Sequence, residues 1–381
     1  MRHVLLALAV VGVVLTAGCA EALDEVDADI KADDAATEAD DAPTETDDAP
    51  DNDDGDGVGM DVDGELEIHH VDVGQADATL VITPEGETIL VDTGDWRQDG
   101  TGVIAYLDDH DVDRIDHLVA THGHADHIGG HAAIIERYET ELDGIGAAYD
   151  SGVAHTSQTY GNYLDAIEEH GVELFEVEAD DELPLADDAV TATVHNPPPG
   201  DSGSGLHENS VTLTIEFGDA TYLTTGDAER AAEERMVEQR GDVLEADVYQ
   251  AGHHGSSTSS TSTFMDVVDP EIAVISSGFE SQYGHPHDEV LERFADRGIE
   301  TYWTGVHGDI VVTTDGESVD VATSEEASTD PAALLEMKPE DDDGTDAIDA
   351  DAVPAPSLHA EAPHAEAEAP HAGPPHVEVT P

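Results

Sequence analysis

The sequence contains very few basic residues. Lysine and arginine number 11 among 381 residues, against 90 aspartates and glutamates, which gives a formal net charge of -79 at pH 7. At an ionic strength of about 1 M the Debye length is only about 3 Å, so such a chain repels itself little in molar salt but strongly in dilute buffer. The composition therefore predicts a halophilic source, such as a halophilic archaeon.

A lack of cations usually argues against a nucleic-acid partner, because binding gains free energy when Lys and Arg neutralise phosphates and release counterions. In molar salt this gain is small for any protein. The charge of the chain therefore excludes neither DNA nor RNA.

Cysteine is almost absent as well. Cys19 is the only one in the sequence, so no disulfide can form within the chain. It follows a fourteen-residue apolar run at residues 4–17, which is too short to span a bilayer comfortably and is typical of a signal peptide. Residues 15–19, L-T-A-G-C, resemble a lipobox, although Thr16 stands where leucine is more common. We expect residues 1–19 to be a lipoprotein signal peptide and Cys19 to carry a lipid anchor.

This resemblance implies an exported protein tethered to the extracellular face of the cell membrane. The alternative is an ordinary cleaved signal peptide with a coincidental cysteine.

Large apolar residues are scarce in two long stretches. Residues 20–63 consist mainly of Asp, Ala, Glu and Thr, and residues 324–381 are acidic and rich in Pro, Ala and His. Such sequences bury too little apolar surface to offset the entropy of ordering, so we predict that both are disordered. One folded domain, residues 64–323, remains.

The two stretches that are predicted to be disordered contain two weak metal-binding patterns. They are a calcium-loop-like run at residues 52–63 and the C-terminal histidines.

Within this domain, short β-branched runs alternate with helical patterns. Strands are predicted at 65–73, 78–82 and 87–91 and helices at 102–110, 129–138, 156–170, 228–240 and 288–297. The alternation predicts an α/β fold, an αββα sandwich with two sheets covered by helices on their outer faces.

The densest group of candidate metal ligands is T-H-G-H-A-D-H-I-G-G at residues 121–130. His122 and His124, two residues apart on an extended loop, can point toward one ion, while Asp126 and His127 can reach a second. Imidazole and carboxylate are the ligands that catalytic Zn²⁺ prefers, with a position left open for water.

This pattern resembles the H-x-H-x-D-H motif of the metallo-β-lactamase superfamily, and further landmarks of that family follow in order. They are V-D-T-G at 91–94, Y-L-T-T-G-D at 222–227 and Y-Q-A-G-H-H-G-S at 249–256. The resemblance implies that Asp92 supports the metal loop from behind and that Asp227 bridges two divalent ions. These ions would be Zn²⁺, with Mn²⁺ as the alternative.

Two ligands of this implied centre stay open at the level of sequence. The second ion needs a histidine from residues 253–254, and we favour His253, with His254 as the alternative. A third imidazole for the first ion has His195 as its best candidate, although His195 is as easily a loop residue.

Four further motifs are more specific. They are V-D-V-G-Q-A-D-A at 71–78, E-N-S-V at 208–211, G-H-H-G-S-S at 252–257 and Y-G-H-P-H at 283–287. They resemble the hydrolase domain of DNA-internalisation competence proteins, except that Ala76 replaces a more common glycine. The membrane helices of that family are missing from this sequence, so we expect any channel to be a separate membrane partner.

The resemblance implies a phosphodiesterase or nuclease that acts on extracellular DNA or RNA through a metal-bound hydroxide, with Asp126 and Asp227 as catalytic groups. Candidate contacts to the substrate phosphate are Asn209, Ser210, His254, Ser256 and His285. Alternatives are a hydrolase of a lactone, thioester or phosphocholine ester on the same fold, or a non-catalytic surface protein that binds nucleic acid or metal. The sequence carries no signal for the oligomeric state.

Overall fold

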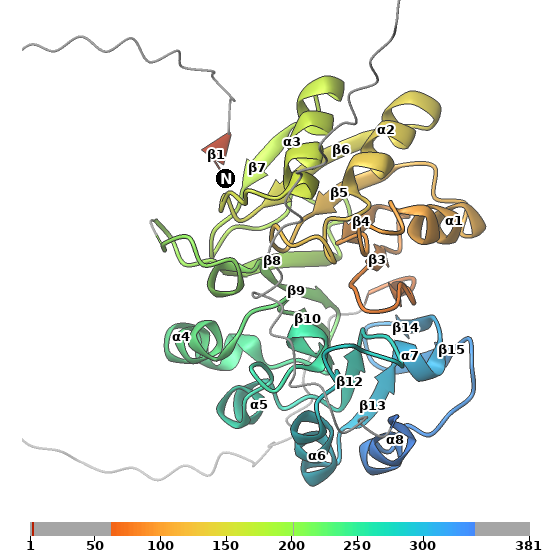
Figure 1. Ribbon diagram of the computed structural model, residues 1–381, viewed down its shortest axis with the longest axis vertical. Helices are drawn as coiled ribbons and strands as arrows, with labels where there is room; N and C mark the ends of the chain where they lie inside the picture. The colour runs from red at the N-terminus through yellow and green to blue at the C-terminus, as the bar shows by residue number, and fades with distance from the viewer. Residues whose placement is uncertain (1, 4–61, 201, 340–381) are drawn as a thin grey trace, which may run out of the picture.

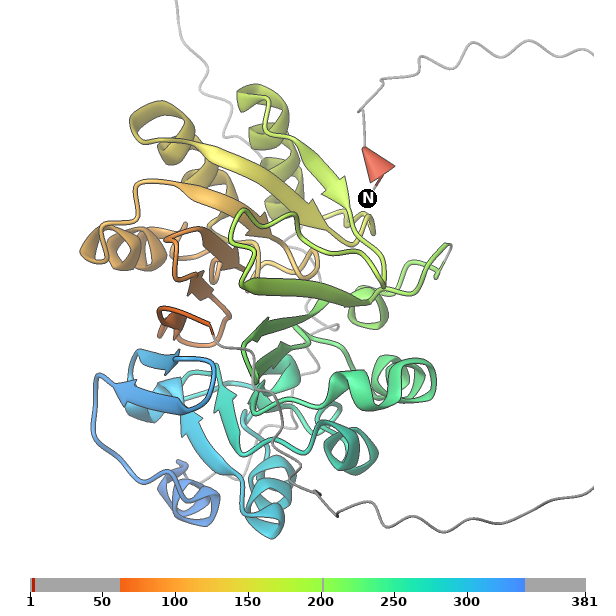
Figure 2. The same ribbon diagram turned by 180° about the vertical axis from the view of Figure 1, so that it is seen from behind.

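The computed structural model describes residues 2–3, 62–200 and 202–339. Two β-sheets pack face to face in these residues, and helices cover the outer face of each sheet (Figures 1 and 2). The expected αββα sandwich is confirmed. The predicted signal peptide, Cys19, the loop at 52–63 and the C-terminal histidines lie wholly or almost wholly outside the described residues. No helix among the described residues is long and apolar enough to cross a membrane.

The first sheet has the strand order β1-β7-β6-β5-β4-β3-β2-β14-β15. Its strands are β1 (Arg2–His3), β2 (Leu66–His70), β3 (Thr79–Ile82), β4 (Thr88–Val91), β5 (Ile115–Val119), β6 (Ile145–Asp150), β7 (Leu174–Glu176), β14 (Ile310–Thr314) and β15 (Val319–Thr323). Its outer face is covered by α1 (Thr101–Asp109), α2 (His131–Glu141) and α3 (Gln158–His170).

The second sheet has the order β13-β12-β11-β10-β9-β8. Its strands are β8 (Val190–Asn196), β9 (Thr212–Phe217), β10 (Ala220–Thr224), β11 (Val248–Gln250), β12 (Ile272–Ile275) and β13 (Glu300–Trp303). The helices on this side are α4 (Arg230–Arg240), α5 (Ser262–Val268), α6 (Asp288–Arg297) and α8 (Pro331–Met337). Shorter turns are η1 (His207–Asn209), η2 (Gly241–Leu244), η3 (Gly252–Gly255) and α7 (Thr304–His307).

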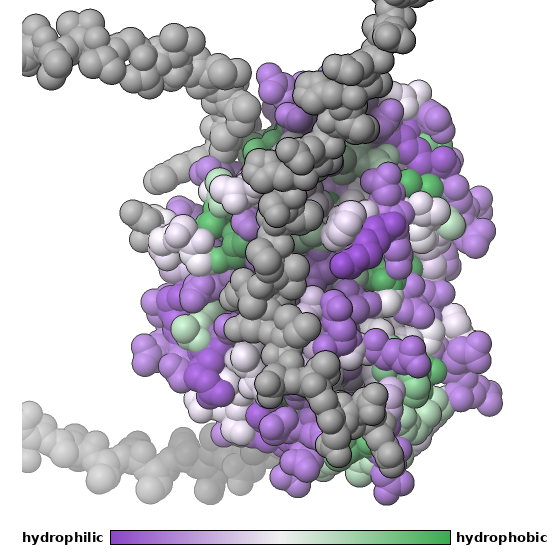
Figure 3. Space-filling model, viewed as in Figure 1, coloured by the Kyte–Doolittle hydropathy of each residue, from purple (hydrophilic) through white to green (hydrophobic). Residues whose placement is uncertain are grey.

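The central strands are buried on both faces, which explains their continuous apolar runs. Successive side chains of a strand point to opposite faces. In β4, Ile89 therefore joins the apolar core between the two sheets, while Leu90 joins the core under the first three helices. A third apolar core, which includes Phe264 and Phe294, fills the space between the second sheet and its helices. Polar side chains cover most of the face shown in Figure 3, as the acidic composition requires.

The folded domain extends beyond the predicted boundary at residue 323. Helix α8 begins at Pro331, where Asp330 accepts a hydrogen bond from the Ala332 N–H, and Leu334 is completely buried in the third core. The residues after 323 therefore continue the fold as far as this helix. The prediction of disorder there was wrong, because one short amphipathic turn was hidden in an acidic, alanine-rich stretch.

Two pairs of parallel strands place the loops that form the site at one edge of the sandwich. Strands β4 and β5 run parallel in the first sheet, and β10 and β11 run parallel in the second. The loops that follow such strands emerge at the same edge of the sheet. The two sheets are tied there, since the Val211 N–H donates to the Thr121 carbonyl at 2.8 Å.

The metal loop, residues 121–130, is held by the loop that follows β4. The Gly129 N–H donates to the Gly94 carbonyl at 2.9 Å, and the Trp96 N–H donates to the Ala125 carbonyl at 2.9 Å. A Cβ on Gly129 would lie 2.1 Å from the Trp96 backbone nitrogen. The two loops therefore approach each other as closely as backbones allow.

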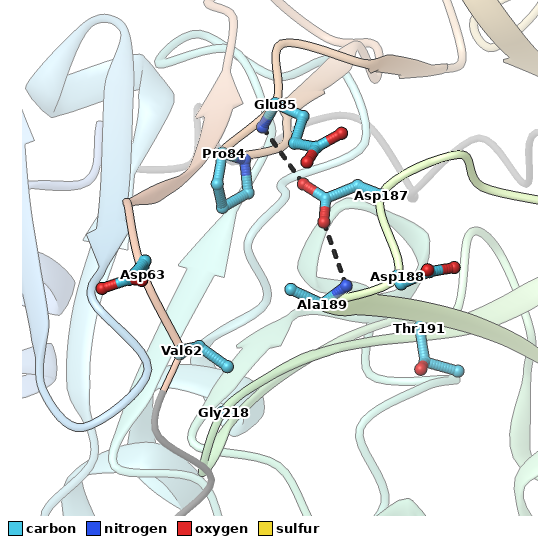
Figure 4. A pocket seen from close by; sticks show the side chains of 9 residues that line it. All are labelled: Val62, Asp63, Pro84, Glu85, Asp187, Asp188, Ala189, Thr191 and Gly218. Atoms are coloured by element: carbon cyan, nitrogen blue, oxygen red, sulfur yellow. Dashed lines mark hydrogen bonds between the residues drawn. The ribbon is translucent and has the colours of Figure 1, made fainter.

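An acidic pocket lies at the opposite end of the strands, beside the β3–β4 turn (Figure 4). Asp187 accepts hydrogen bonds there from the backbone N–H groups of Glu85 and Ala189, at 3.1 and 3.0 Å. Glu85 precedes β4, whereas Asp92 follows it, so this pocket is separate from the site described next.

We expect Gly129→Ala to lower the free energy of unfolding by about 1–3 kcal/mol or more, because the new methyl group overpacks two backbones. Gly102→Ala is the matched control: its Cβ would meet only the flexible Gln98 side chain, and alanine favours a helix by up to about 1 kcal/mol. Denaturant unfolding in molar KCl measures both. Equal stability of the two variants would contradict the close approach of the loops.

Candidate metal centre

The centre lies where loops from both sheets meet. The metal loop follows β5, Asp227 follows β10, and the histidine pair of η3 follows β11. His253 and His254 both adopt left-handed backbone conformations, with φ of 51° and 56°. Such a conformation costs roughly 1–2 kcal/mol for a non-glycine residue, and this strain separates the two rings, whose centroids lie 6.0 Å apart.

The first cluster consists of His122, His124, His207 and one carboxylate oxygen of Asp227. His122 Nε2 lies 2.8 Å from His124 Nδ1 and 3.6 Å from Asp227 Oδ2. His207 Nε2 lies 3.3 Å from His124 Nδ1 and 4.0 Å from Asp227 Oδ2. Four ligands of a tetrahedral zinc ion lie about 3.3 Å apart, given bonds of about 2.0–2.1 Å. The spacing of these atoms therefore suits one cation.

The second cluster consists of Asp126, His127, His254 and the other oxygen of Asp227. His254 Nε2 lies 3.4 Å from Asp126 Oδ2 and 3.9 Å from Asp227 Oδ1, and His127 Nε2 lies 3.1 Å from the same Oδ1. These two Nε2 atoms and Asp227 Oδ1 are buried without a hydrogen-bond partner. Buried polar atoms are rarely left unpaired, so a bound cation fits this set.

Outer residues fix which ring nitrogen of each ligand faces inward. His127 Nδ1 lies 2.7 Å from Asp92 Oδ2, and His254 Nδ1 lies 3.0 Å from the Ser276 carbonyl. A proton held on Nδ1 leaves the lone pair on Nε2 for a metal. Asp92 also accepts from the N–H and hydroxyl of Thr121, at 2.9 and 2.7 Å, as expected for a support behind the metal loop.

Asp77 is a further support that the sequence did not reveal. One of its oxygens lies 3.9 Å from His254 Nδ1, and the other accepts from Gln250 Nε2 at 2.6 Å. Because it lies on the Nδ1 side of His254, it belongs behind the second cluster and not among its ligands.

The electrostatics of the first cluster are those of a cation site. Burial and neighbouring imidazoles lower the pKa of His122 well below its usual value and that of His124 to about 4, so both are neutral at pH 7. Burial alone would raise the pKa of Asp227, but His127 and His253 outweigh it and hold this pKa well below its usual value. Neutral imidazoles and an ionised carboxylate are the forms that bind metal.

In the second cluster, the pKa values of the imidazoles are raised. Burial alone would lower the pKa of each imidazole, but Asp227 outweighs it and raises the pKa of His127 well above its usual value and that of His254 to about 9. An ion bound there would therefore displace a proton from each ring.

The third imidazole of the first cluster is His207, not His195. His195 Nε2 lies 2.8 Å from the Thr214 hydroxyl, and burial lowers the pKa of His195 to about 4. His195 belongs to β8 itself, whereas His207 is carried by the turn η1 that precedes β9. Of the two possibilities left open for His195, the structure therefore favours a residue outside the metal clusters.

The preference for His253 over His254 in the second cluster was wrong. His254 faces Asp126 and His127, while His253 Nε2 lies 3.5 Å from Asp227 Oδ2, on the side of the first cluster. The paired left-handed conformations cause this division, and no sequence pattern predicts them.

Glu229 connects two imidazoles behind the first cluster. Its Oε1 lies 3.5 Å from His207 Nδ1 and 3.2 Å from His253 Nδ1. Hydrogen bonds with His207 and His253 hold the pKa of Glu229 well below its usual value. Glu229 was not identified from the sequence, although it stands only two residues after Asp227.

The residues predicted to contact substrate divide into two groups. Ser210 Oγ accepts from the Asp227 N–H at 3.0 Å, Asn209 Nδ2 donates to the Gly205 carbonyl at 2.8 Å, and Ser256 Oγ lies 3.0 Å from the Thr258 hydroxyl. These three side chains bond within the surrounding loops, and their role as substrate contacts stays a prediction. His254 lies among the ligands of the second cluster, 3.4 Å from Asp126 Oδ2, and the His285 ring lies 5.7 Å from that of His253, beside the clusters.

A comparison with protein families agrees with this geometry. The model of the Metallo-beta-lactamase superfamily matches residues 71–278. The chain belongs to this superfamily. Its members share the α/β sandwich described above, and the two clusters are those of a metal-dependent hydrolase of the superfamily that could hold a dinuclear centre.

Relatives of this superfamily member include competence proteins. The chain is 29% identical over 262 residues to ComE operon protein 3 of Bacillus subtilis, covering 65% of this chain and 33% of that protein. It is 31% identical over 237 residues to competence protein ComA of Neisseria gonorrhoeae (62% and 30%) and 28% identical over 232 residues to recombination protein 2 of Haemophilus influenzae (60% and 26%). The chain thus spans about a third of the length of these relatives.

We expect His207→Ala to reduce the bound metal from about two ions to about one per chain, because it removes an imidazole from the first cluster only. His195→Ala, the matched control, should keep two. Metal content after loading with Zn²⁺ in molar KCl measures both variants. Loss of an ion from the His195 variant would restore His195 as a ligand.

Glu229→Ala should weaken binding of the first ion about 10–100-fold, the usual loss when an outer carboxylate is removed from a metal-binding histidine. Competition titration of Zn²⁺ against a chelator measures the affinity. Glu234 is exposed on α4, the helix that begins directly after Glu229, so Glu234→Ala serves as the control. Equal affinities of the two variants would show that Glu229 does not orient the imidazoles.

Proposed function

We propose that this chain is a two-metal phosphodiesterase that acts on nucleic acid. The observation that carries the proposal is the Asp227 carboxylate, whose two oxygens face two separate ligand clusters. Two divalent ions held this way supply Lewis acids on both sides of a phosphodiester and lower the pKa of a water molecule. The competence and recombination proteins among the relatives support nucleic acid as the substrate.

Asp126 is suited to orient a water molecule, or to accept its proton, at the exposed side of the metal centre. Its side chain is 28% exposed, whereas that of Asp227 is 2% exposed. Burial alone would raise the pKa of Asp126, but the neighbouring His254 and His127 outweigh it and keep this pKa below its usual value. Asp126 is therefore an ionised carboxylate at the entrance, able to orient a water molecule.

His285 is suited to hold a phosphate oxygen. Gln75 Nε2 lies 3.2 Å from His285 Nδ1, and an amide N–H can only donate, so the imidazole proton resides on Nε2. Burial and the neighbouring His254 lower the pKa of His285 to about 2, which makes it a neutral donor at pH 7. A neutral N–H beside the clusters can bind a non-bridging oxygen.

The setting of this activity remains a proposal from the sequence. The lipobox-like residues before Cys19 support an extracellular, lipid-anchored enzyme, and a separate membrane channel would be its partner if it serves DNA uptake.

The test is hydrolysis of bis(p-nitrophenyl) phosphate, single-stranded DNA and double-stranded DNA by residues 20–381 in molar KCl with Zn²⁺ or Mn²⁺. We expect His122→Ala to reduce cleavage more than about 100-fold, beyond the loss typical of an outer residue. His170→Ala, at the far end of α3, should leave the rate unchanged.

A lactone and a thioester serve as comparison substrates. Cleavage of either of them without cleavage of any phosphodiester would overturn the proposal and favour another hydrolase of the same fold. Binding of DNA without any hydrolysis would favour a non-catalytic surface protein.

A further inference from the structure

The chain is poor in aromatic residues, yet it exposes a tryptophan beside the metal loop. Only 4% of its residues are Phe, Trp or Tyr, and there are two tryptophans. Trp303 is fully buried, whereas Trp96 is 53% exposed. An exposed indole offers a large, flat apolar face with a polar N–H to a ligand.

Trp96 is held in place by the metal loop itself. Its N–H donates to the carbonyl of Ala125, which stands between the cluster residues His124 and Asp126. A Cβ on Gly129 would lie 2.1 Å from the Trp96 backbone nitrogen, so the backbones of the two loops are tightly packed at this point. The backbone of Trp96 is therefore fixed beside the metal loop.

A guanidinium group accompanies the indole ring. The Arg97 guanidinium lies over the Trp96 ring, 5.0 Å from its centroid, and its Nη1 donates to Asp95 at 2.9 Å, while the Arg97 backbone N–H donates to the same carboxylate at 2.7 Å. The ion pair with Asp95 neutralises the charge of Arg97. The stacked Trp96 and Arg97 side chains therefore offer a ligand a flat, polarisable surface and little net positive charge.

A second aromatic side chain lies near the second cluster, on the side of the other sheet. Tyr283 belongs to the loop after β12, and its ring lies 5.7 Å from that of His285. The His285 ring in turn stacks 6.3 Å from that of His254. Tyr283 is therefore two rings away from a ligand of the second cluster.

An aromatic surface suits binding of nucleic acid in molar salt. In molar salt a protein gains little by neutralising phosphates with Lys and Arg, and Arg97, the cation beside Trp96, is already paired with Asp95. Stacking of a base on an aromatic ring depends little on charge and contributes affinity at high salt. A base that stacks on a side chain must be unstacked from its neighbouring base on that face, which a single strand allows.

We propose that Trp96 is a stacking platform for a nucleobase next to the scissile phosphodiester, so that the centre selects single-stranded nucleic acid through its bases. The inference rests on the proposed phosphodiesterase function.

The kinetic test compares two probes with equal backbone charge, oligo(dT) and an abasic tetrahydrofuran oligonucleotide. The ratio of kcat/KM for oligo(dT) to kcat/KM for the abasic probe should fall about tenfold in Trp96→Leu, through a higher KM for oligo(dT). Trp96→Phe keeps an aromatic face and should retain most of the ratio. Val243→Ser, which alters another exposed apolar residue, should not change it.

A binding test is independent of turnover. Because Trp303 is buried, phosphorothioate oligo(dT) added to the metal-loaded protein should quench the emission of Trp96 alone. The abasic probe should quench it much less, and Trp96→Phe should abolish the quenching.

The outcomes separate the two proposals. An unchanged ratio in Trp96→Leu, or an equal loss on both probes, overturns the stacking platform while leaving the phosphodiesterase intact. If the wild-type protein cleaves no phosphodiester, the proposed function fails, and the fluorescence titration alone decides: base-dependent quenching supports the platform, and quenching by neither probe overturns it. Stronger quenching by lipid vesicles than by oligo(dT) also overturns it in favour of a membrane contact.

Discussion

The geometry of the centre depends on the position of one carboxylate. Asp227 lies at the junction of the two sheets, where its N–H is held by Ser210 and its oxygens face the two clusters. Burying an ionised carboxylate is costly unless charges and hydrogen bonds compensate it. The imidazoles around Asp227 provide part of that compensation, so ligands from four loops converge on one point. The αββα sandwich places these loops at a common edge.

Much of the fold could be predicted from the sequence, because strands buried on both faces appear as continuous apolar runs and the metal loop is a contiguous motif. His122, His124, Asp126 and His127 were found together for this reason, as were Asp92 and Asp227 at strand ends. The structure brings all six into one place.

The remaining residues could not be found by local patterns. His207 reaches the first cluster from a short turn about 80 positions away from the metal loop, and nothing nearby distinguishes it from His195. The assignment of His253 and His254 depends on two backbone angles that propensity does not predict. Helix α8 was missed since its burial depends on a groove beside α6, which exists only in the folded chain.

The turn that carries His253 and His254 borders both ion positions. Its left-handed backbone places His254 among the ligands of the second cluster and His253 3.5 Å from Asp227 Oδ2, beside the first. A substitution that relaxes this backbone is therefore expected to disturb the surroundings of both positions at once, although only one of its two imidazoles is a ligand.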